Sequence, residues 1–133
     1  MLEIVTPRTT AEARKALQIK RPGVDRIVTW RYFESRTNGR WDIHVHPKSR
    51  LTINVESGIP FLKLRSGHVE IVFKSSWGNS LDMDAGTTAH VVVPWSNTKV
   101  TIGGDASGLA LDLPTGDHRV CVPDWNLWGK HAS

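Results

Sequence analysis

The sequence has a single cysteine and no long apolar segment. Because Cys121 has no second cysteine to pair with, an internal disulfide framework is excluded and a reducing compartment is expected. No apolar run approaches the roughly 20 residues that a membrane-spanning helix needs. The first fifteen residues contain no long apolar stretch and no small-residue cleavage site, so we expect no secretory signal. These absences predict a soluble, cytoplasmic protein with no membrane partner.

The composition is that of an ordinary globular protein. Apolar residues make up 39% and charged residues 23% of the chain, which argues against wholesale disorder. A length of 133 residues suits one hydrophobic core and is too short for two. We therefore expect a single β-rich domain over residues 1–133, with residues 1–23 packing on its body.

Positive charge is concentrated in the first part of the chain. Residues 1–50 carry eleven Lys/Arg against five Asp/Glu, whereas the remainder carries six against eight. A basic half can face nucleic acid, an acidic protein or an anionic surface, and it can equally be a solvated surface.

One helix is expected near the N-terminus, after a short strand at Leu2–Val5. Thr9-Thr10-Ala11-Glu12 matches a capping box in which Thr9 is the N-cap and Glu12 reaches back to the amide of Thr9. Alanine and leucine follow, and Arg21-Pro22-Gly23 ends the helix, which we place at residues 10–19.

From Val24 onward, short β-branched and aromatic runs alternate with Gly, Pro, Asn and Ser. The expected strands are 24–35, 41–46, 50–56, 61–65, 68–74, 81–84, 88–95, 99–102, 109–113 and 117–122. Strands recurring about every ten residues without helices between them predict a mainly β fold, an antiparallel β-sandwich or open barrel of about 8–10 short strands. We identify no internal repeat.

A β-hairpin is predicted around Ser66-Gly67. A two-residue turn there pairs Leu64 with Val69 and Lys63 with Glu70, which places apolar residues on one face and opposite charges on the other.

His44 and His46 are candidate metal ligands, since residues two apart on a strand point the same way. The pair superficially resembles the first motif of the cupins, with Gly39 before it and Gly58 after it. This sequence offers Ser49-Arg50-Leu51 where that motif has a glutamate, and the five residues after Pro94 include no histidine for the second motif. Solvent-facing strand histidines are the alternative. We expect no metal or other cofactor.

No nucleophile signature is present, and we expect no enzymatic activity. Cys121 lies in an apolar strand context typical of a buried thiol, and residues 103–108 lack the lysine of a phosphate-binding loop.

Basic and aromatic residues alternate between Trp30 and Arg50. Such a mixture can form a stacking platform for nucleic acid, or the aromatic rings can fill the core while the arginines face water. The candidate interaction residues are Arg31, Arg36, Arg40, Lys48, Arg50, Trp77, Trp125 and Trp128.

The last third carries Val91-Val92-Val93-Pro94-Trp95, then Lys99-Val100-Thr101-Ile102, and then Leu111-Asp112-Leu113-Pro114-Thr115-Gly116 leading into a final strand. Over residues 88–122 this order resembles the competence protein J family, whose members inhibit a DNA-entry nuclease. The resemblance implies a protein partner and no catalysis. A nuclease inhibitor usually mimics an acidic substrate, however, and the first 50 residues here are basic.

Our leading hypothesis is a non-enzymatic protein-binding domain. It is either an inhibitor or immunity-type partner of a nuclease or toxin, or a self-assembling structural subunit such as a phage virion or decoration protein. The six tryptophans and the basic N-terminal part favour the structural version. The alternatives are nucleic-acid binding through the basic half and a cupin-like metal enzyme.

Overall fold

The strands form two six-stranded sheets. The computed structural model describes residues 2–31, 40–57, 60–74, 79–94, 99–113 and 119–121. Sheet A has the order β1 (Leu2–Val5), β3 (Asp25–Trp30), β5 (Arg50–Val55), β7 (His68–Phe73), β9 (Thr88–Val92) and β11 (Leu109–Asp112). Sheet B has the order β2 (Gln18–Ile19), β4 (Arg40–Val45), β6 (Phe61–Ser66), β8 (Asn79–Met83), β10 (Lys99–Gly104) and β12 (Arg119–Cys121). Helix α1 (Thr10–Ala16) lies between β1 and β2.

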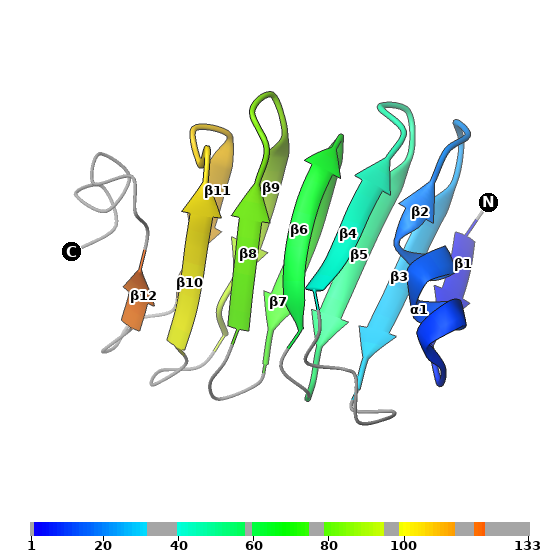
Figure 1. Cartoon of the computed structure of the whole chain (residues 1–133), viewed down its shortest axis with the longest axis horizontal. Helices are drawn as coiled ribbons and strands as arrows, with labels where there is room; N and C mark the ends of the chain where they lie inside the picture. Colours follow the sequence, from blue (N-terminus) through cyan, green and yellow to red (C-terminus); the bar gives the residue numbers. More distant parts are fainter. Residues whose placement is uncertain are drawn as a thin grey trace.

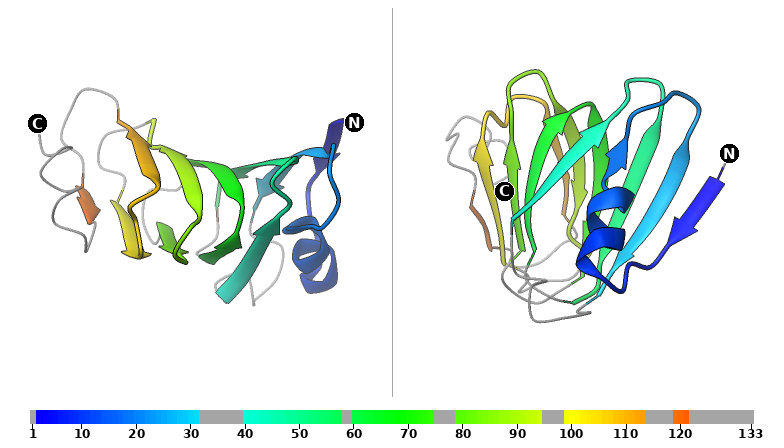
Figure 2. Two further views of the ribbon diagram at one scale, coloured as in Figure 1. Left: turned by 90° about the horizontal axis from the view of Figure 1, so that it is seen from above. Right: turned by 45° about the vertical axis from the view of Figure 1, so that its right-hand side comes forward.

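All of these strand pairs are parallel, and the chain changes sheet after each strand from β2 onward. Val69, Ala89 and Leu109 are 20 residues apart and lie side by side in β7, β9 and β11. Figure 1 shows the coils stacked from β1 at one end to β12 at the other, and Figure 2 shows the two layers. The fold is a parallel β-solenoid.

The expected antiparallel sandwich or open barrel is therefore wrong, although most of the expected strands are present. The error has a physical cause. Strict alternation of apolar and polar residues is typical of antiparallel sheets with one wet face, since most parallel sheets are covered on both faces. Here each sheet is parallel, buries its inner face against the other sheet and leaves its outer face exposed, so the alternation arises without antiparallel pairing.

The predicted hairpin at Ser66-Gly67 is also wrong. This dipeptide is a corner at which the chain leaves sheet B and enters sheet A. Leu64 lies beside Met83, and Val69 lies beside Leu51 and Ala89. A glycine with positive φ suits a tight turn of either kind, so the turn residues alone do not distinguish a hairpin from a corner.

A repeat that the sequence analysis did not identify is visible in the corners. Gly23, Gly67, Gly86 and Gly104 have φ between 75° and 84°, and each lies at the passage from an even strand to the next odd strand. The register places Arg26 beside Leu51 and Leu51 beside Val69, so these coils are 25 and 18 residues long. Unequal coil lengths hide the period from a search at fixed spacing.

The hydrophobic core fills the space between the sheets. Val28, Ile53, Ile71 and Val91 form one continuous inward row of sheet A, and all four are fully buried. Leu62, Leu81 and Ile102 form a matching row of sheet B. Burial of each such side chain contributes about 1.5–3 kcal/mol, so repetition of the rows stabilises the stack as a whole.

Helix α1 covers part of the N-terminal end of this core. Thr9 Oγ1 accepts a hydrogen bond from the Glu12 amide at 3.1 Å, which confirms Thr9 as the N-cap. The Glu12 carboxylate accepts from the Arg8 amide at 3.3 Å, one residue earlier than expected. Ala13 and Ala16 are the buried residues of the helix.

The helix is shorter than the expected span of 10–19. It ends at Ala16, because Gln18 and Ile19 pair with His44 and Val45 of β4 instead of continuing the helix. Pairing with a neighbouring strand has overridden local helix propensity. The short strand β2 thereby becomes the N-terminal edge of sheet B.

Candidate functional site

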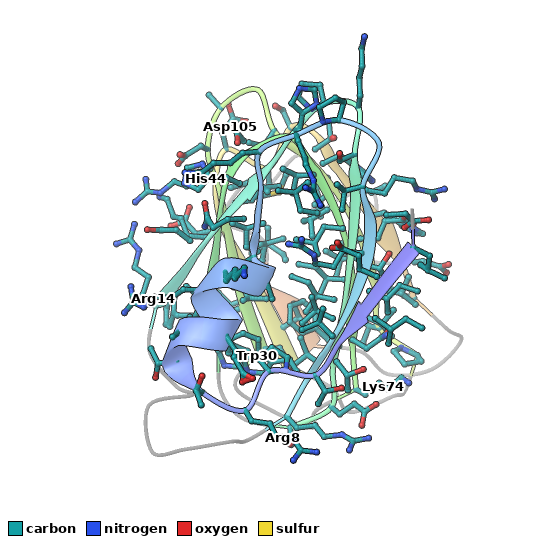
Figure 3. The ribbon with its side chains drawn as sticks, turned by 90° about the vertical axis from the view of Figure 1, so that its right-hand side faces the viewer. Arg8, Arg14, Trp30, His44, Lys74 and Asp105 are labelled. Carbon is teal, nitrogen blue, oxygen red and sulfur yellow. The ribbon has the colours of Figure 1, made fainter. Side chains whose placement is uncertain are left out.

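Three hollows meet at β2, at the N-terminal end of the solenoid. The first, which we name the end hollow, has a volume of about 510 Å³ and is lined by residues that include Glu3, Lys15, Lys20, Arg21 and Arg26. Figure 3 looks onto this end of the molecule, with α1 and β1 in front. The hollow lies between residues of the two edge strands, so it marks the place where the stack of coils stops.

Arg26 organises the end hollow. Its side chain is only 13% exposed, and its guanidinium lies 2.7 Å from Glu3 Oε1. Arg26 Nη1 also donates to the carbonyl oxygens of Ala16 at 3.0 Å and Gln18 at 3.2 Å. These carbonyls belong to the last residue of α1 and the first of β2, so one side chain joins β3, β1, the helix end and β2.

The same contact sets the ionisation of Glu3. Its hydrogen bond from Arg26 holds the pKa of the Glu3 carboxyl below its ordinary value, with a further contribution from Arg21 at 3.7 Å. Glu3 is therefore a neutralised anion at neutral pH. Lys15 and Lys20 form no ion pair within the described part of the chain, so the rim of the end hollow carries excess positive charge.

Strand β1 is the open edge of sheet A. Its one strand neighbour in the described structure is β3. Leu2 and Ile4 point outward and are 58% and 72% exposed, whereas Glu3 lies on the face that meets Arg26. Natural edge strands usually carry charges or proline that discourage pairing with another chain. The one charge of β1, Glu3, faces inward and is paired with Arg26, and its outer face carries two aliphatic side chains.

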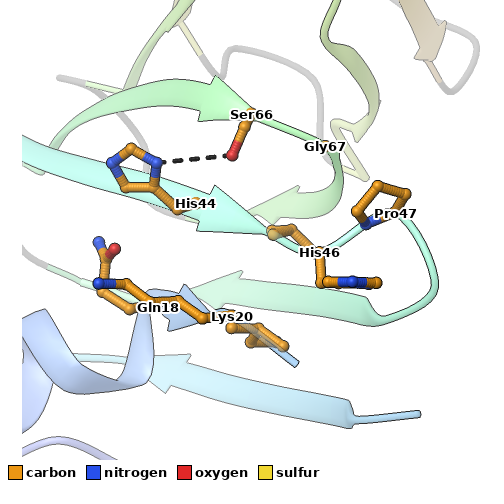
Figure 4. Close-up of a pocket in the computed structure, with 9 residues that line it drawn as sticks. Gln18, Lys20, His44, His46, Pro47, Ser66 and Gly67 are labelled. Atoms are coloured by element: carbon orange, nitrogen blue, oxygen red, sulfur yellow. Dashed lines mark hydrogen bonds between the residues drawn. The ribbon is translucent and has the colours of Figure 1, made fainter. Parts of the chain in front are cut away.

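The other two hollows adjoin each other on the outer face of sheet B. They have volumes of about 410 and 360 Å³ and share Gln18, Lys20 and His44, and we name the pair the β2–β4 groove. Figure 4 shows its first part, from Gln18 and His44 to Pro47 and Gly67. The second part extends to Arg14 and Arg40.

His44 and His46, the candidate metal ligands, both line this groove, but each ring is engaged separately. His44 Nδ1 lies 3.5 Å from Ser66 Oγ, and His46 Nδ1 accepts from the Lys48 amide at 3.0 Å. Within the described ranges, no group of three or more His, Cys, Asp or Glu side chains is arranged to hold a metal ion. Ser49, at the position of the cupin glutamate, is a turn anchor: its hydroxyl donates to the Arg21 carbonyl and accepts from the Val24 amide.

The basic residues predicted for interaction are divided between the two sheets. Arg40 lies on β4 in sheet B, whereas Arg50 lies on β5 in sheet A and pairs with Glu70 at 3.2 Å. Arg31 follows β3 and pairs with Glu56 at 3.0 Å. Lys48 is exposed in the turn between β4 and β5. The structure therefore does not bring these residues together on one platform.

The predicted aromatic platform is not formed by Trp30 and Trp41. Both are buried in the core, where their rings meet edge to face with centroids 5.0 Å apart. Trp30 is labelled in Figure 3 between the two sheets. The remaining candidates Arg36, Trp77, Trp125 and Trp128 lie outside the described residues, as does the expected turn at 37–39.

Five surface residues were not predicted from the sequence as interaction sites: Leu2, Ile4, Arg14, Lys20 and Phe61. Phe61 is 54% exposed on the outer face of sheet B, directly beside Arg40 in the strand register. Leu2, Ile4 and Phe61 each occupy an alternating strand position that would be buried if the other face were the inner one. If Leu62 and Leu64 are taken to face the core, the alternation of side chains along the strand places Phe61 on the outer face.

The outer face of sheet A carries a second polar network. Glu70 accepts hydrogen bonds from His90 and Arg50, which hold the pKa of its carboxyl below the ordinary value. His68 Nδ1 and Thr88 Oγ1 are 2.7 Å apart on neighbouring strands. None of these residues lines the end hollow or either of the other two hollows at β2.

No helix in the described ranges is long and apolar enough to cross a membrane. Comparison with family models, with curated proteins and with solved structures found no match to this chain.

Proposed function

We propose that the protein is a non-enzymatic binding module that takes a strand of a partner protein onto the open edge of β1. The observation that carries the proposal is the outward exposure of Leu2 and Ile4 on a strand whose one described neighbour is β3. An edge of this kind offers backbone hydrogen bonds for affinity and alternate side chains for specificity.

The charges around the edge indicate the character of the partner. Lys15, Lys20 and Arg21 line the adjacent end hollow, and the nearby carboxylate of Glu3 is neutralised by Arg26. A second copy docked edge to edge would bring like charges together. An acidic partner strand complements the site, so the charges favour the inhibitor-type version of the hypothesis over self-assembly at this edge. The resemblance at residues 88–122 lies at the other end of the solenoid and does not support the choice.

The test is quantitative affinity capture from a nuclease-treated lysate of the source organism. The variant is the double substitution Leu2→Lys and Ile4→Lys, which introduces the charges that edge strands normally carry. The matched control is Phe61→Lys, an exposed apolar residue on the other sheet. We expect acidic proteins that bind the wild type and the control to fall at least about tenfold with the double variant, a loss of about 1.4 kcal/mol.

Hydrogen exchange in the purified complex supplies the second readout. Strand addition slows exchange of β1 amides, whereas docking through another surface leaves them unchanged. Capture that is equal for all three proteins, or absent for the wild type, would overturn the proposal.

A further inference from the structure

A second surface lies on the outer face of sheet B and adjoins the end hollow at β2, where Lys20 lines both. It consists of the β2–β4 groove together with Phe61. Arg40 joins the two parts, because it lines the groove and is the register neighbour of Phe61. Neighbouring strands are about 4.8 Å apart, so an exposed aromatic ring adjoins a cationic channel without a gap in the sheet.

This surface carries a net positive charge, because its one acidic side chain is already paired with arginines. Asp42, the one carboxylate lining the described groove, accepts a hydrogen bond from Arg65 at 3.1 Å and lies 3.9 Å from Arg40. Lys20 has no carboxylate partner in the described part of the chain. The guanidinium of Arg14 lies over the ring of Trp41, 5.6 Å from its centroid, and projects from α1 beside the groove. Arg14 and Lys20 therefore have no carboxylate partner in the described residues, and Arg40 shares Asp42 with Arg65.

The local backbone aims polar groups into the groove. A register shift between Ile43 and His44 places His44 beside Ser66 instead of Arg65, so that Gln18, His44 and Ser66 follow one another across β2, β4 and β6. Bulges of this kind redirect side chains and are frequent beside binding sites. Figure 4 shows His44, Gln18 and Lys20 around the same hollow. The lining is thus polar as well as cationic.

We infer that this surface binds single-stranded nucleic acid, with one base stacked on Phe61 and the phosphodiester backbone lying along Arg40, Arg14 and Lys20. Single-strand binders combine an aromatic stacking platform with a basic groove, and both are present on one face here. A duplex keeps its bases stacked inside and cannot use Phe61. An acidic protein segment would satisfy the cations but gains less from a flat aromatic ring, so nucleic acid fits both features.

The experiment measures fluorescence anisotropy of a labelled oligothymidylate of about 12 nucleotides. Three phosphate contacts predict that log K falls with log salt at a slope of about −2. Phe61→Ala is expected to weaken binding about fivefold or more, since one stacked base is lost. Lys20→Glu is expected to weaken binding and make the salt slope shallower. Ile4→Ala and Lys74→Glu are matched controls on other parts of the surface, and both should bind as the wild type does.

Competition experiments distinguish binding of single-stranded nucleic acid from binding of other polyanions. A duplex of the same length and inorganic polyphosphate should both compete less well than the single strand, because neither offers a base to Phe61. Equal competition by all three polyanions, an unchanged affinity of Phe61→Ala, or no binding at about 50 mM salt would each overturn the inference. The double Lys variant of Leu2 and Ile4 should retain binding, which separates this site from the protein-binding edge.

Discussion

Lys63 on β6 pairs with Asp82 on the neighbouring coil, with 3.5 Å between Lys63 Nζ and Asp82 Oδ1. The sequence predicted Glu70 as the partner of Lys63, but Glu70 lies on the outer face of the other sheet. The pairing shows how the solenoid brings together residues 19 positions apart while it separates residues seven apart. The same stacking brings together the residues of the two proposed binding surfaces.

Arg26 is expected to stabilise the N-terminal end of the stack. Substitution Arg26→Met keeps much of the aliphatic volume but removes the donors to the Ala16 and Gln18 carbonyls and the ion pair with Glu3. We predict a loss of about 2 kcal/mol in the free energy of unfolding, measured by urea denaturation. Arg31→Met is the matched control at an exposed ion pair and should cost less than about 1 kcal/mol. Equal losses would contradict the role given to Arg26.

Glu3 is expected to make the protein less stable in acid. Because its folded pKa lies below the unfolded value, its contribution is present above about pH 4.3, the ordinary glutamate value, and is lost as pH falls through the lower folded pKa. Glu3→Gln should therefore reduce the slope of unfolding free energy against pH in this acid range. In the Arg26→Met background the same substitution should have little further effect. An unchanged slope in the single variant would contradict the assignment.

Alanine substitutions at Gly67 and Gly86 distinguish the cost of steric crowding from the cost of backbone strain. Both have positive φ, but a Cβ at Gly67 would meet the Val45 carbonyl, whereas at Gly86 it would meet nothing within 4 Å. Gly86→Ala should cost about 1–2 kcal/mol from the left-handed backbone alone. Gly67→Ala should cost clearly more, as measured by the midpoints of chemical denaturation. Similar costs would mean that the corner at Gly67 is looser than the structure shows.

The sequence predicted the local elements better than their arrangement. Thr9 as helix cap, the alternation along β6 and β7, and most strand positions follow from neighbours within a few residues. The pairing of Leu62 with Leu81 depends on contacts between successive coils. Neither the alternation of apolar residues nor the Ser66-Gly67 turn carries information about those contacts. The coils differ in length, so Gly23, Gly67, Gly86 and Gly104 do not recur at one spacing.

For the candidate site, too, the sequence identified single residues better than their arrangement in space. His44 was singled out from its spacing to His46, and it does line a hollow, although with Gln18 and Lys20 from a segment expected to be helical or a turn. Arg31, Arg40 and Arg50 were grouped because they are near in sequence, yet sheets A and B separate them. Phe61 was not singled out from the sequence, because the hairpin hypothesis considered only the apolar residues of the inward face.

All of the surfaces described depend on parallel stacking of successive coils, and nuclear Overhauser contacts between backbone protons test that stacking most directly. Parallel stacking predicts contacts of Leu62 with both Leu81 and Trp41, and of Val69 with Leu51 and Ala89. Backbone contacts between Leu64 and Val69 across a two-residue turn, with none between Leu62 and Leu81, would contradict it.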